Sequence, residues 1–298
     1  MPDKTDWDVV TGVGLTALGA AAIRAIEGHH PEPLVSDPYA AAFVRAAGQL
    51  PRPLPVTPEE ADADPDFPWY GLARYLGVRS KFFDGFFAAA TQAAGIRQVV
   101  ILAAGLDTRA FRLGWPDGMT LHEIDKPLVI SFKNSVLAGE GAIAGCERRT
   151  APCDLRDDWA TALLAAGFDP ARPTAWLAEG LFMYLPDEAK DALLASVDRL
   201  SAAGSRVAIE HVPSAVQDRG TAAGSAVVSR VDDDLAGLWA TEYRHDPVAA
   251  LRTSGWTVTA DLVPDVAERY GRPLTDVPLA SQLSSVLVTG VKPALENP

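Results

Sequence analysis

A loop of small residues and a pair of carboxylates stand at a spacing that suits the binding of a nucleoside. Ala103 and Gly105 directly follow an apolar run at 98–102, and residues this small let a ligand approach the backbone closely. Glu123 and Asp125 lie 18 and 20 residues beyond Gly105. At that distance, a carboxylate at a strand end accepts hydrogen bonds from both hydroxyls of a ribose. These residues therefore predict a site for an adenosine group.

Further positions carry side chains that suit the rest of an adenosine ligand. Asp154 and Leu155 follow a third predicted strand, where the carboxylate would accept the adenine amine and the leucine would pack on the ring. Glu179 follows a fourth predicted strand. Each feature alone is weak, because a lone acid at a strand end is usually a helix cap or solvated. Four such features in register favour one ligand at the carboxyl ends of a parallel sheet.

The loop after the first strand lacks the glycine patterns that bind phosphate groups. A dinucleotide site needs G-x-G-x-x-G and a phosphate loop needs G-x-x-x-x-G-K-[ST], and neither is present there. A nicotinamide oxidoreductase is disfavoured for that reason, and a hydrolase is weaker still because no G-x-S-x-G occurs. An adenosine cofactor without phosphates fits better, which points to S-adenosyl-L-methionine.

Seven segments are predicted to form the strands that position these residues: 98–102, 120–124, 148–151, 174–178, 206–209, 257–262 and 285–289. Helix-like segments lie between several of them, most clearly at 187–200, where apolar residues recur at three- and four-residue spacing. Alternating strands and helices are typical of an α/β fold with a mainly parallel sheet covered on both faces. Residues 212–247 break this alternation and are predicted to form a helical insert.

The first 95 residues have a different, mainly helical pattern. Helices are predicted at three places: 13–27, a segment that begins with Asp37 as its N-cap, and 75–94. Residues 51–68 hold six prolines among Asp and Glu and are predicted to be a loop, with a mobile lid as one possibility. We therefore divide the chain into a helical cap at 1–95 and a cofactor-binding domain at 96–298.

Composition narrows the classes of partner. The 298 residues include 26 Lys and Arg against 39 Asp and Glu, a net charge of −13, and 48% are hydrophobic, enough for a packed core. Nucleic acids and anionic membranes select clustered Lys and Arg, so both are disfavoured as partners. Cys146 and Cys153 complete neither a disulfide framework nor a metal-ligand pattern. With no signal peptide or membrane-spanning run expected, we predict a cytoplasmic protein without a metal.

Several sequence runs together resemble the leucine carboxyl methyltransferase family. The main ones are VVILAAGLDTRAFRL at 99–113, HEIDKP at 122–127 and AEGLFMYLP at 178–186. Supporting runs lie at 14–27, 33–43, 78–87 and 270–274, so the resemblance covers nearly the whole chain. It is closest to the bacterial small-molecule branch of these S-adenosylmethionine-dependent enzymes. The resemblance implies a class I methyltransferase fold with a Rossmann-like sheet of seven strands, the last antiparallel, and an N-terminal helical cap over the site.

The resemblance also implies roles for individual residues. The cofactor contacts include positions already singled out: Ala103, Gly105, Glu123, Asp125, Asp154 and Leu155. Arg79 matches an arginine that pairs with the methionine carboxylate of the cofactor, and Arg24 occupies the place of a second basic contact. Glu179 matches a glutamate beneath the methionine amino group and methyl. These roles agree with the chemistry, because an arginine fork binds a carboxylate and a glutamate attracts an ammonium or sulfonium.

Methyl transfer is an in-line displacement that leaves S-adenosyl-L-homocysteine, and the enzyme's main tasks are alignment and exclusion of water. A carboxylate acceptor is already ionised and needs no base, whereas a phenol or hydroxyl is helped by one. Glu179, His245 and Arg272 are the candidates for the chemistry, with Arg272 holding an acceptor carboxylate. His211 is a second histidine to test. Analogy with the family favours a carboxylate.

Aromatic residues of the cap and the insert are candidates for acceptor recognition: Trp69, Tyr70, Trp239, Tyr243 and Tyr270. We therefore predict an S-adenosylmethionine-dependent O-methyltransferase that acts on a small-molecule metabolite of secondary metabolism, at a carboxylate. Two alternatives stay open. One is O-methylation of a phenol or hydroxyl of a natural product, and the other is a non-catalytic cofactor-binding module. The sequence does not define the oligomeric state.

Overall fold

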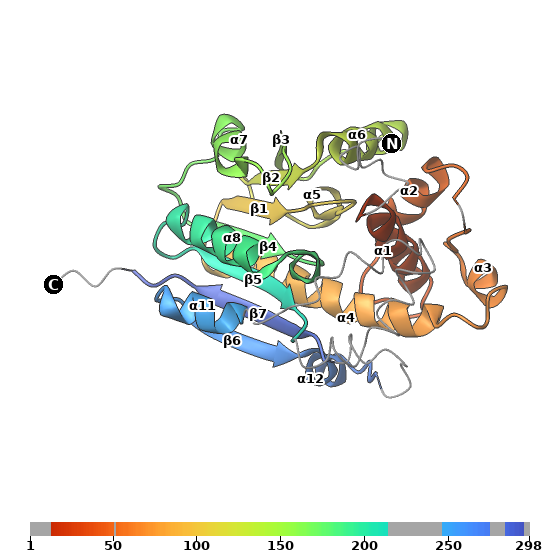
Figure 1. Cartoon of the computed structure of the whole chain (residues 1–298). Helices are drawn as coiled ribbons and strands as arrows, with labels where there is room; N and C mark the ends of the chain where they lie inside the picture. Colours follow the sequence, from red (N-terminus) through yellow and green to blue (C-terminus); the bar gives the residue numbers. More distant parts are fainter. Residues whose placement is uncertain (1–12, 51, 214–245, 275–283, 295–298) are drawn as a thin grey trace.

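The structure is a computed structural model and describes residues 13–50, 52–213, 246–274 and 284–294 (Figure 1). Its centre is a seven-stranded sheet in the order β3-β2-β1-β4-β5-β7-β6. The strands are β1 (Gln98–Leu102), β2 (Thr120–Asp125), β3 (Glu147–Pro152), β4 (Thr174–Ala178), β5 (Arg206–His211), β6 (Thr257–Leu262) and β7 (Val286–Val291). β7 runs antiparallel to β5 and β6, whereas the pairs from β3 to β5 are parallel. The predicted α/β fold class is confirmed.

The central strands are apolar on both faces because helices cover both. All five residues of β1 and of β4 are buried, whereas no residue of β6, at the edge of the sheet, is fully buried. Side chains alternate between faces along a strand, so Val99 and Ile101 join one hydrophobic cluster while Val100 and Leu102 join the other. The bounds predicted from these apolar runs agree with the structure to within two residues for every strand.

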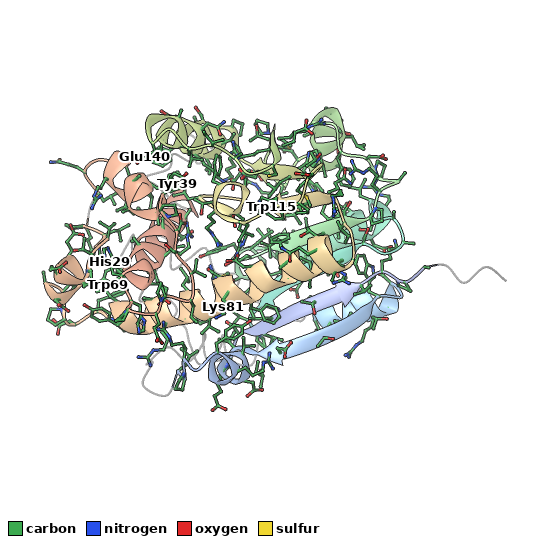
Figure 2. The ribbon with its side chains drawn as sticks, turned by 180° about the vertical axis from the view of Figure 1, so that it is seen from behind. His29, Tyr39, Trp69, Lys81, Trp115 and Glu140 are labelled. Atoms are coloured by element: carbon green, nitrogen blue, oxygen red, sulfur yellow. The ribbon has the colours of Figure 1, made fainter. Side chains whose placement is uncertain are left out.

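Helices from both halves of the chain cover the sheet. The cluster on one face includes residues of α4 (Trp69–Ala88), α6 (Pro127–Gly139) and α12 (Val263–Arg269). The cluster on the other face includes residues of α7 (Trp159–Ala165), α8 (Asp187–Arg199) and α11 (Pro247–Thr253). Figure 1 shows α8 and α11 in front of the sheet, and Figure 2, seen from behind, shows α4 across the opposite face. α4 belongs to the predicted helical cap, yet it packs on the sheet of the predicted cofactor-binding domain. The division of the chain into two parts at residue 95 stays a prediction.

The remaining elements surround the carboxyl ends of the strands or connect the larger ones. They are α1 (Val13–Gly28), α2 (Ala40–Ala46), α3 (Pro58–Asp62), a π-helical turn (Ala89–Ala93), α5 (Arg109–Arg112) and a 3-10 turn (Phe182–Tyr184). α1 packs against α2 and α4 and lies opposite the arrowheads of the central strands (Figure 1). None of the helices within the described ranges is long and apolar enough to cross a membrane.

Two helix starts differ from the prediction. α2 begins at Ala40 with Tyr39 as its N-cap, not with Asp37. The Asp37 carboxylate is instead buried, where it accepts hydrogen bonds from Arg24 Nε at 2.9 Å and from the Tyr39 N–H at 3.1 Å. α4 begins at Trp69, directly after a proline and six residues before the predicted start. The early start adds the buried Trp69 to the hydrophobic core.

The segment 51–68 is not loop throughout, because it contains α3. A reciprocal capping box starts this helix: the Thr57 hydroxyl accepts from the Glu60 N–H at 3.3 Å, and the Glu60 carboxylate accepts from the Thr57 N–H. Pro58 at the first helical position is also favourable there. Of the predicted insert at 212–247, residues 214–245 lie outside the described ranges.

Candidate active site

A cavity of about 450 Å³ lies at the carboxyl ends of the strands, where the sheet order switches between β1 and β4. Its walls come from α1, α4 and the segments that follow β1, β2, β3, β4 and β5. In Figure 1 the arrowheads of β1 and β5 point toward these two helices. Switch points of this kind are where open α/β sheets bind ligands, and the volume suits a ligand of cofactor size.

The loop after β1 enters the left-handed backbone region at two positions. The φ angle is 50° at Ala103 and 47° at Gly105, and among the described residues Ala103 is the only non-glycine with a positive φ. A Cβ atom added to Gly105 would lie 3.5 Å from the Ala17 Cβ of α1. That is an ordinary van der Waals distance, so it is the backbone turn that favours glycine here. The strained Ala103 is a feature that functional sites often carry.

The Asp125 carboxylate joins this loop to the end of β2 and lines the cavity. Its Oδ2 accepts the Gly105 N–H at 2.6 Å and its Oδ1 accepts the Lys126 N–H at 2.7 Å. Burial raises the pKa of Asp125, and the two N–H donors act in the opposite direction. The two contacts fix the carboxylate at the cavity wall, where the sequence predicts a ribose contact.

Glu123 does not line the cavity, so the structure does not bring it together with the other predicted cofactor contacts. Its carboxylate is fully buried and accepts hydrogen bonds from Lys133 Nζ at 2.8 Å and from Arg148 Nη2 at 2.7 Å. These contacts connect α6 and β3 to Glu123, and removing one partner would leave a buried charge unpaired. Sequence spacing alone could not separate Glu123 from Asp125, because both lie near the end of the same strand.

Asp154 and Leu155 line the cavity on the segment after β3. Arg156 contacts Asp154 through its backbone N–H at 2.9 Å and through Nη2 at 2.7 Å. Burial acts to raise the pKa of Asp154, but the hydrogen bonds from Arg156 outweigh it and hold the pKa at about 2. The carboxylate is therefore ionised and a strong hydrogen-bond acceptor beside an apolar side chain, which is the pair predicted for an adenine edge.

Arg79 of α4 and Glu179, which follows β4, form an ion pair in the cavity wall. Arg79 Nε donates to Glu179 Oε1 at 2.8 Å, and both side chains are mostly buried. Burial acts to raise the pKa of Glu179, but the positive charges of Arg109 and Arg79 lower it. Arg79 Nη2 forms no hydrogen bond with any described residue. That group is a donor available to an anionic part of a ligand.

Arg109 is a second buried cation at this end of the cavity, and the sequence reasoning gave it no role. Its Nε donates to Asp84 at 2.7 Å, and its Nη1 donates to Glu179 Oε2 at 2.8 Å and to Asp107. Burial acts to raise the pKa of Asp107, but the Arg109 guanidinium outweighs it and holds the pKa at about 2. The sequence DTR at 107–109, next to the cofactor loop, is the signal that could have indicated this cluster.

Three more polar residues of the cavity wall were not predicted from the sequence: Tyr75, Glu210 and Ser285. Tyr75 donates a short hydrogen bond to Glu210 Oε1 and lies 3.1 Å from Ser285 Oγ. Glu210 also accepts from Arg79 Nη1, at 3.0 and 3.1 Å, and from the Gly180 N–H at 2.8 Å. Glu210 could have been indicated by its place in a buried strand, and Tyr75 by its position four residues before Arg79 on the same helix.

Arg24 of α1 lines the cavity, as its predicted role requires. Besides the ion pair with Asp37, its Nη2 donates to the Leu106 carbonyl at 2.8 Å. This bond connects α1 to the loop after β1, so Arg24 helps to close the cavity whether or not it also contacts a ligand.

Arg272 is not in the described cavity wall, so its predicted catalytic role stays a prediction. Its Nη2 donates to the Glu32 carbonyl, contacts His30 Nδ1 at 2.8 Å and lies 3.6 Å from the Glu27 carboxylate. Burial raises the pKa of Glu27, so a nearby cation offsets the cost of ionising it there. Arg272 therefore joins the chain after α12 to the end of α1, and its role in this structure is to hold these two segments together.

The other residues predicted for acceptor recognition or base catalysis do not meet in the cavity. His245, Trp239 and Tyr243 lie outside the described residues. His211 is buried at the end of β5 and is not in the cavity wall.

The aromatic residues Trp69, Tyr70 and Tyr270 are elsewhere too. The ring of Tyr270 lies 5.0 Å from the ammonium of Lys81, which Figure 2 labels on α4. Within the described part of the chain, no histidine lines the cavity and no group of three His, Cys, Asp or Glu residues is placed to hold a metal ion.

Comparisons with known proteins agree on the family. The model of the leucine carboxyl methyltransferase family matches residues 17–198. A protein of Saccharopolyspora erythraea is 50% identical over 279 residues, which cover 93% of this chain and 94% of that protein. A protein of Rhodococcus jostii is 46% identical over 283 residues, 93% of each chain. Both bear provisional names as S-adenosyl-L-methionine-dependent methyltransferases.

Solved structures share the fold at low sequence identity. A DUF574 family protein from Streptomyces avermitilis has a TM-score of 0.54 and 17% identity, covering 85% of this chain and 96% of that one. A provisionally named methyltransferase from Thermobifida fusca has the same TM-score and identity, covering 92% and 94%. At this identity the likeness concerns the fold, and it agrees with the predicted seven-stranded sheet.

Proposed function

The chain belongs to the leucine carboxyl methyltransferase family, and from that premise we propose that it methylates a carboxylate of a small-molecule metabolite. As a member of this family it is an S-adenosyl-L-methionine-dependent methyltransferase. We propose in addition that the methyl group goes to oxygen, that this oxygen belongs to a carboxylate, and that the acceptor is a small molecule. We also propose a cytoplasmic location and a role in secondary metabolism.

The cavity wall fits the two halves of this cofactor. For the adenosine half, Asp125 would accept the ribose hydroxyls, and Asp154 with Leu155 would hold the adenine. For the amino-acid half, Arg79 Nη2 would donate to the carboxylate and Glu179 would accept from the ammonium. The carboxylates of Asp154 and Glu179 both have lowered pKa values and are ionised at neutral pH. Each polar part of the cofactor thus has an oppositely charged or hydrogen-bonding side chain in one cavity.

When bound, S-adenosyl-L-methionine supplies a methyl group activated by the adjacent sulfonium. The chain's own residues then have to align the acceptor and exclude water. α1 contributes to exclusion because Arg24 connects it to the loop after β1. Glu179 and Arg79 fix the amino-acid end of the site with a 2.8 Å ion pair.

The described cavity wall supports a carboxylate acceptor through the groups that it presents. No histidine is present there, and Glu179 is held by two arginines that lower its pKa. An acceptor carboxylate is already ionised and requires no proton removal, whereas a phenol or alcohol does. The name of the family points to the same chemistry.

The observation that carries the proposal is that the Gly105–Asp125 contact and the Arg79–Glu179 ion pair share one cavity. To test it, the protein is incubated with a metabolite extract and a cofactor whose methyl group carries deuterium. Mass spectrometry should find a product with one labelled methyl, and mild base should release the label as methanol. A labelled product that resists base is not an ester and would overturn the carboxylate assignment; a methylated phenol or hydroxyl is one such product.

A further inference from the structure

Arg79 lies between two carboxylates that come from neighbouring strands. Its Nε donates to Glu179, at the end of β4, and its Nη1 lies 3.0 and 3.1 Å from the two oxygens of Glu210, in β5. Burial acts to lower the pKa of Arg79, but the two carboxylates outweigh it and raise the pKa above its ordinary value. The guanidinium is therefore charged and held from two sides.

The two carboxylates differ in exposure and in partners. The Glu179 side chain is 13% exposed and the Glu210 side chain is 0% exposed. Glu210 accepts from Tyr75, from Arg79 and from the Gly180 N–H at 2.8 Å. Gly180 has a φ of 65° and directly follows Glu179. Glu210 thus holds both the guanidinium of Arg79 and the backbone beside Glu179.

Tyr75 supports this arrangement from α4, one helical turn before Arg79. Its hydroxyl donates to Glu210, and the Arg79 guanidinium carbon lies 5.8 Å from the centre of its ring. Burial and the neighbouring Glu210 raise the pKa of Tyr75, so the phenol stays protonated and remains a donor. The Glu210 carboxylate thus accepts from three donors, of which Arg79 carries a positive charge.

We propose that Glu210, held by Tyr75, is the positioning residue of the methionine end of the cofactor site, because it fixes Arg79 and the Gly180 backbone. The proposal rests on the proposed function, in which Arg79 binds the cofactor carboxylate and Glu179 binds its ammonium. When Glu179 is shared with that ammonium, Glu210 is the buried anion that keeps Arg79 in place. Its effect is therefore confined to ligands that carry the amino-acid group.

Two ligands separate this role from general damage to the fold. S-adenosyl-L-homocysteine carries the amino-acid group, whereas 5′-methylthioadenosine has the same adenosine and thioether without it. Binding of both is measured by calorimetry for the wild type, Glu210→Gln and Tyr75→Phe. Glu188→Gln, at an exposed position of α8, is the control for the same chemical change.

Glu210→Gln should weaken S-adenosyl-L-homocysteine about 10-fold or more, since a charge-assisted contact is lost, and should leave 5′-methylthioadenosine within about 2-fold. Tyr75→Phe should also weaken S-adenosyl-L-homocysteine relative to 5′-methylthioadenosine, by a smaller factor. Glu188→Gln should leave the ratio of the two affinities unchanged. An unchanged affinity for both ligands in Glu210→Gln, or an equal loss of both, would overturn the positioning role. A wild type that binds neither ligand would instead refute the proposed function on which the role rests.

Discussion

Glu123 and Asp125 are separated by one residue in β2, yet their carboxylates serve different parts of the protein. Asp125 accepts the Gly105 N–H at the cavity wall, whereas Glu123 is buried against Lys133 of α6, 2.8 Å from its ammonium. The strand ends at Asp125, so its side chain reaches the loop after β1 while that of Glu123 stays beneath the helix. One carboxylate belongs to the site and the other to the core.

This difference predicts that Glu123→Gln lowers stability, whereas Asp125→Ala weakens cofactor binding. Removing the buried charge leaves Lys133 without its counterion, and breaking a buried ion pair costs about 3–5 kcal/mol. A thermal melt should show a midpoint lower by roughly 5–10 °C. Calorimetry below that midpoint should give a cofactor affinity equal to that of the wild type. An affinity loss with an unchanged melting temperature would place Glu123 in the site after all.

Gly105 offers a test of the loop conformation. Gly105→Ala puts a Cβ on a residue with a φ of 47° and next to Ala17, so about 1–2 kcal/mol of backbone strain is expected. Because the loop lines the cavity, part of that strain should also appear as weaker cofactor binding. Gly28→Ala at the end of α1 is the control, since an added Cβ there meets no atom within 4 Å. Equal effects of the two substitutions on binding would contradict a specific role for the loop.

Arg272→Ala tests whether this arginine is catalytic or holds two segments of the fold together. The substitution removes the contacts with Glu27, His30 and the Glu32 carbonyl, so the melting temperature should fall by roughly 1–2 °C for each kcal/mol lost. Transfer of labelled methyl in the metabolite extract should proceed at the wild-type rate below that temperature. A large loss of methyl transfer in a folded Arg272→Ala protein would support the catalytic assignment.

His122 predicts a specific pH dependence of stability. Its ring is fully buried, neither nitrogen has a hydrogen-bond partner among the described residues, and burial lowers its pKa from 6.5 to about 4. Between these pH values the unfolded chain binds the proton and the folded chain does not, so stability falls as the pH drops from 6.5 to 4. The shift corresponds to about 3 kcal/mol, at about 1.4 kcal/mol per pH unit.

The measurement compares urea unfolding of the wild type and of His122→Phe at pH 7 and at pH 4. The phenyl ring keeps the packing against Phe168 and cannot take up a proton. From pH 7 to pH 4 the unfolding free energy of the wild type should therefore fall by more than that of the variant. A difference that stays constant over this range would show that His122 titrates equally in both states.

Local pattern was enough to predict the sheet, because its strands are short apolar runs with turn residues at their ends. It was also enough for the residues at those ends, since a parallel sheet brings the carboxyl ends of its strands to one edge. Glu179, Asp125 and Asp154 line one cavity for that reason. Contacts between segments that are distant in sequence leave no local pattern from which they could be predicted.

The residues whose positions differ from the expectation, or that were overlooked, all depend on such contacts. Glu123 meets a lysine of α6 and Arg272 meets the end of α1, neither of which spacing along the chain reveals. Glu210 was overlooked because its partner Tyr75 lies 135 residues away in sequence. Helix starts differed where a side chain such as Asp37 had a tertiary partner that outweighed its local capping role.

The most direct test is calorimetric titration of the purified protein with S-adenosyl-L-methionine, with Asp125→Ala as the variant. The wild type should bind with micromolar affinity at one site. Asp125→Ala should bind about 100-fold more weakly, because it loses the charge-assisted bonds to the ribose and the contact that holds the loop after β1. No detectable binding by the folded wild type at saturating cofactor would contradict the account, and so would an Asp125→Ala variant that binds as tightly as the wild type.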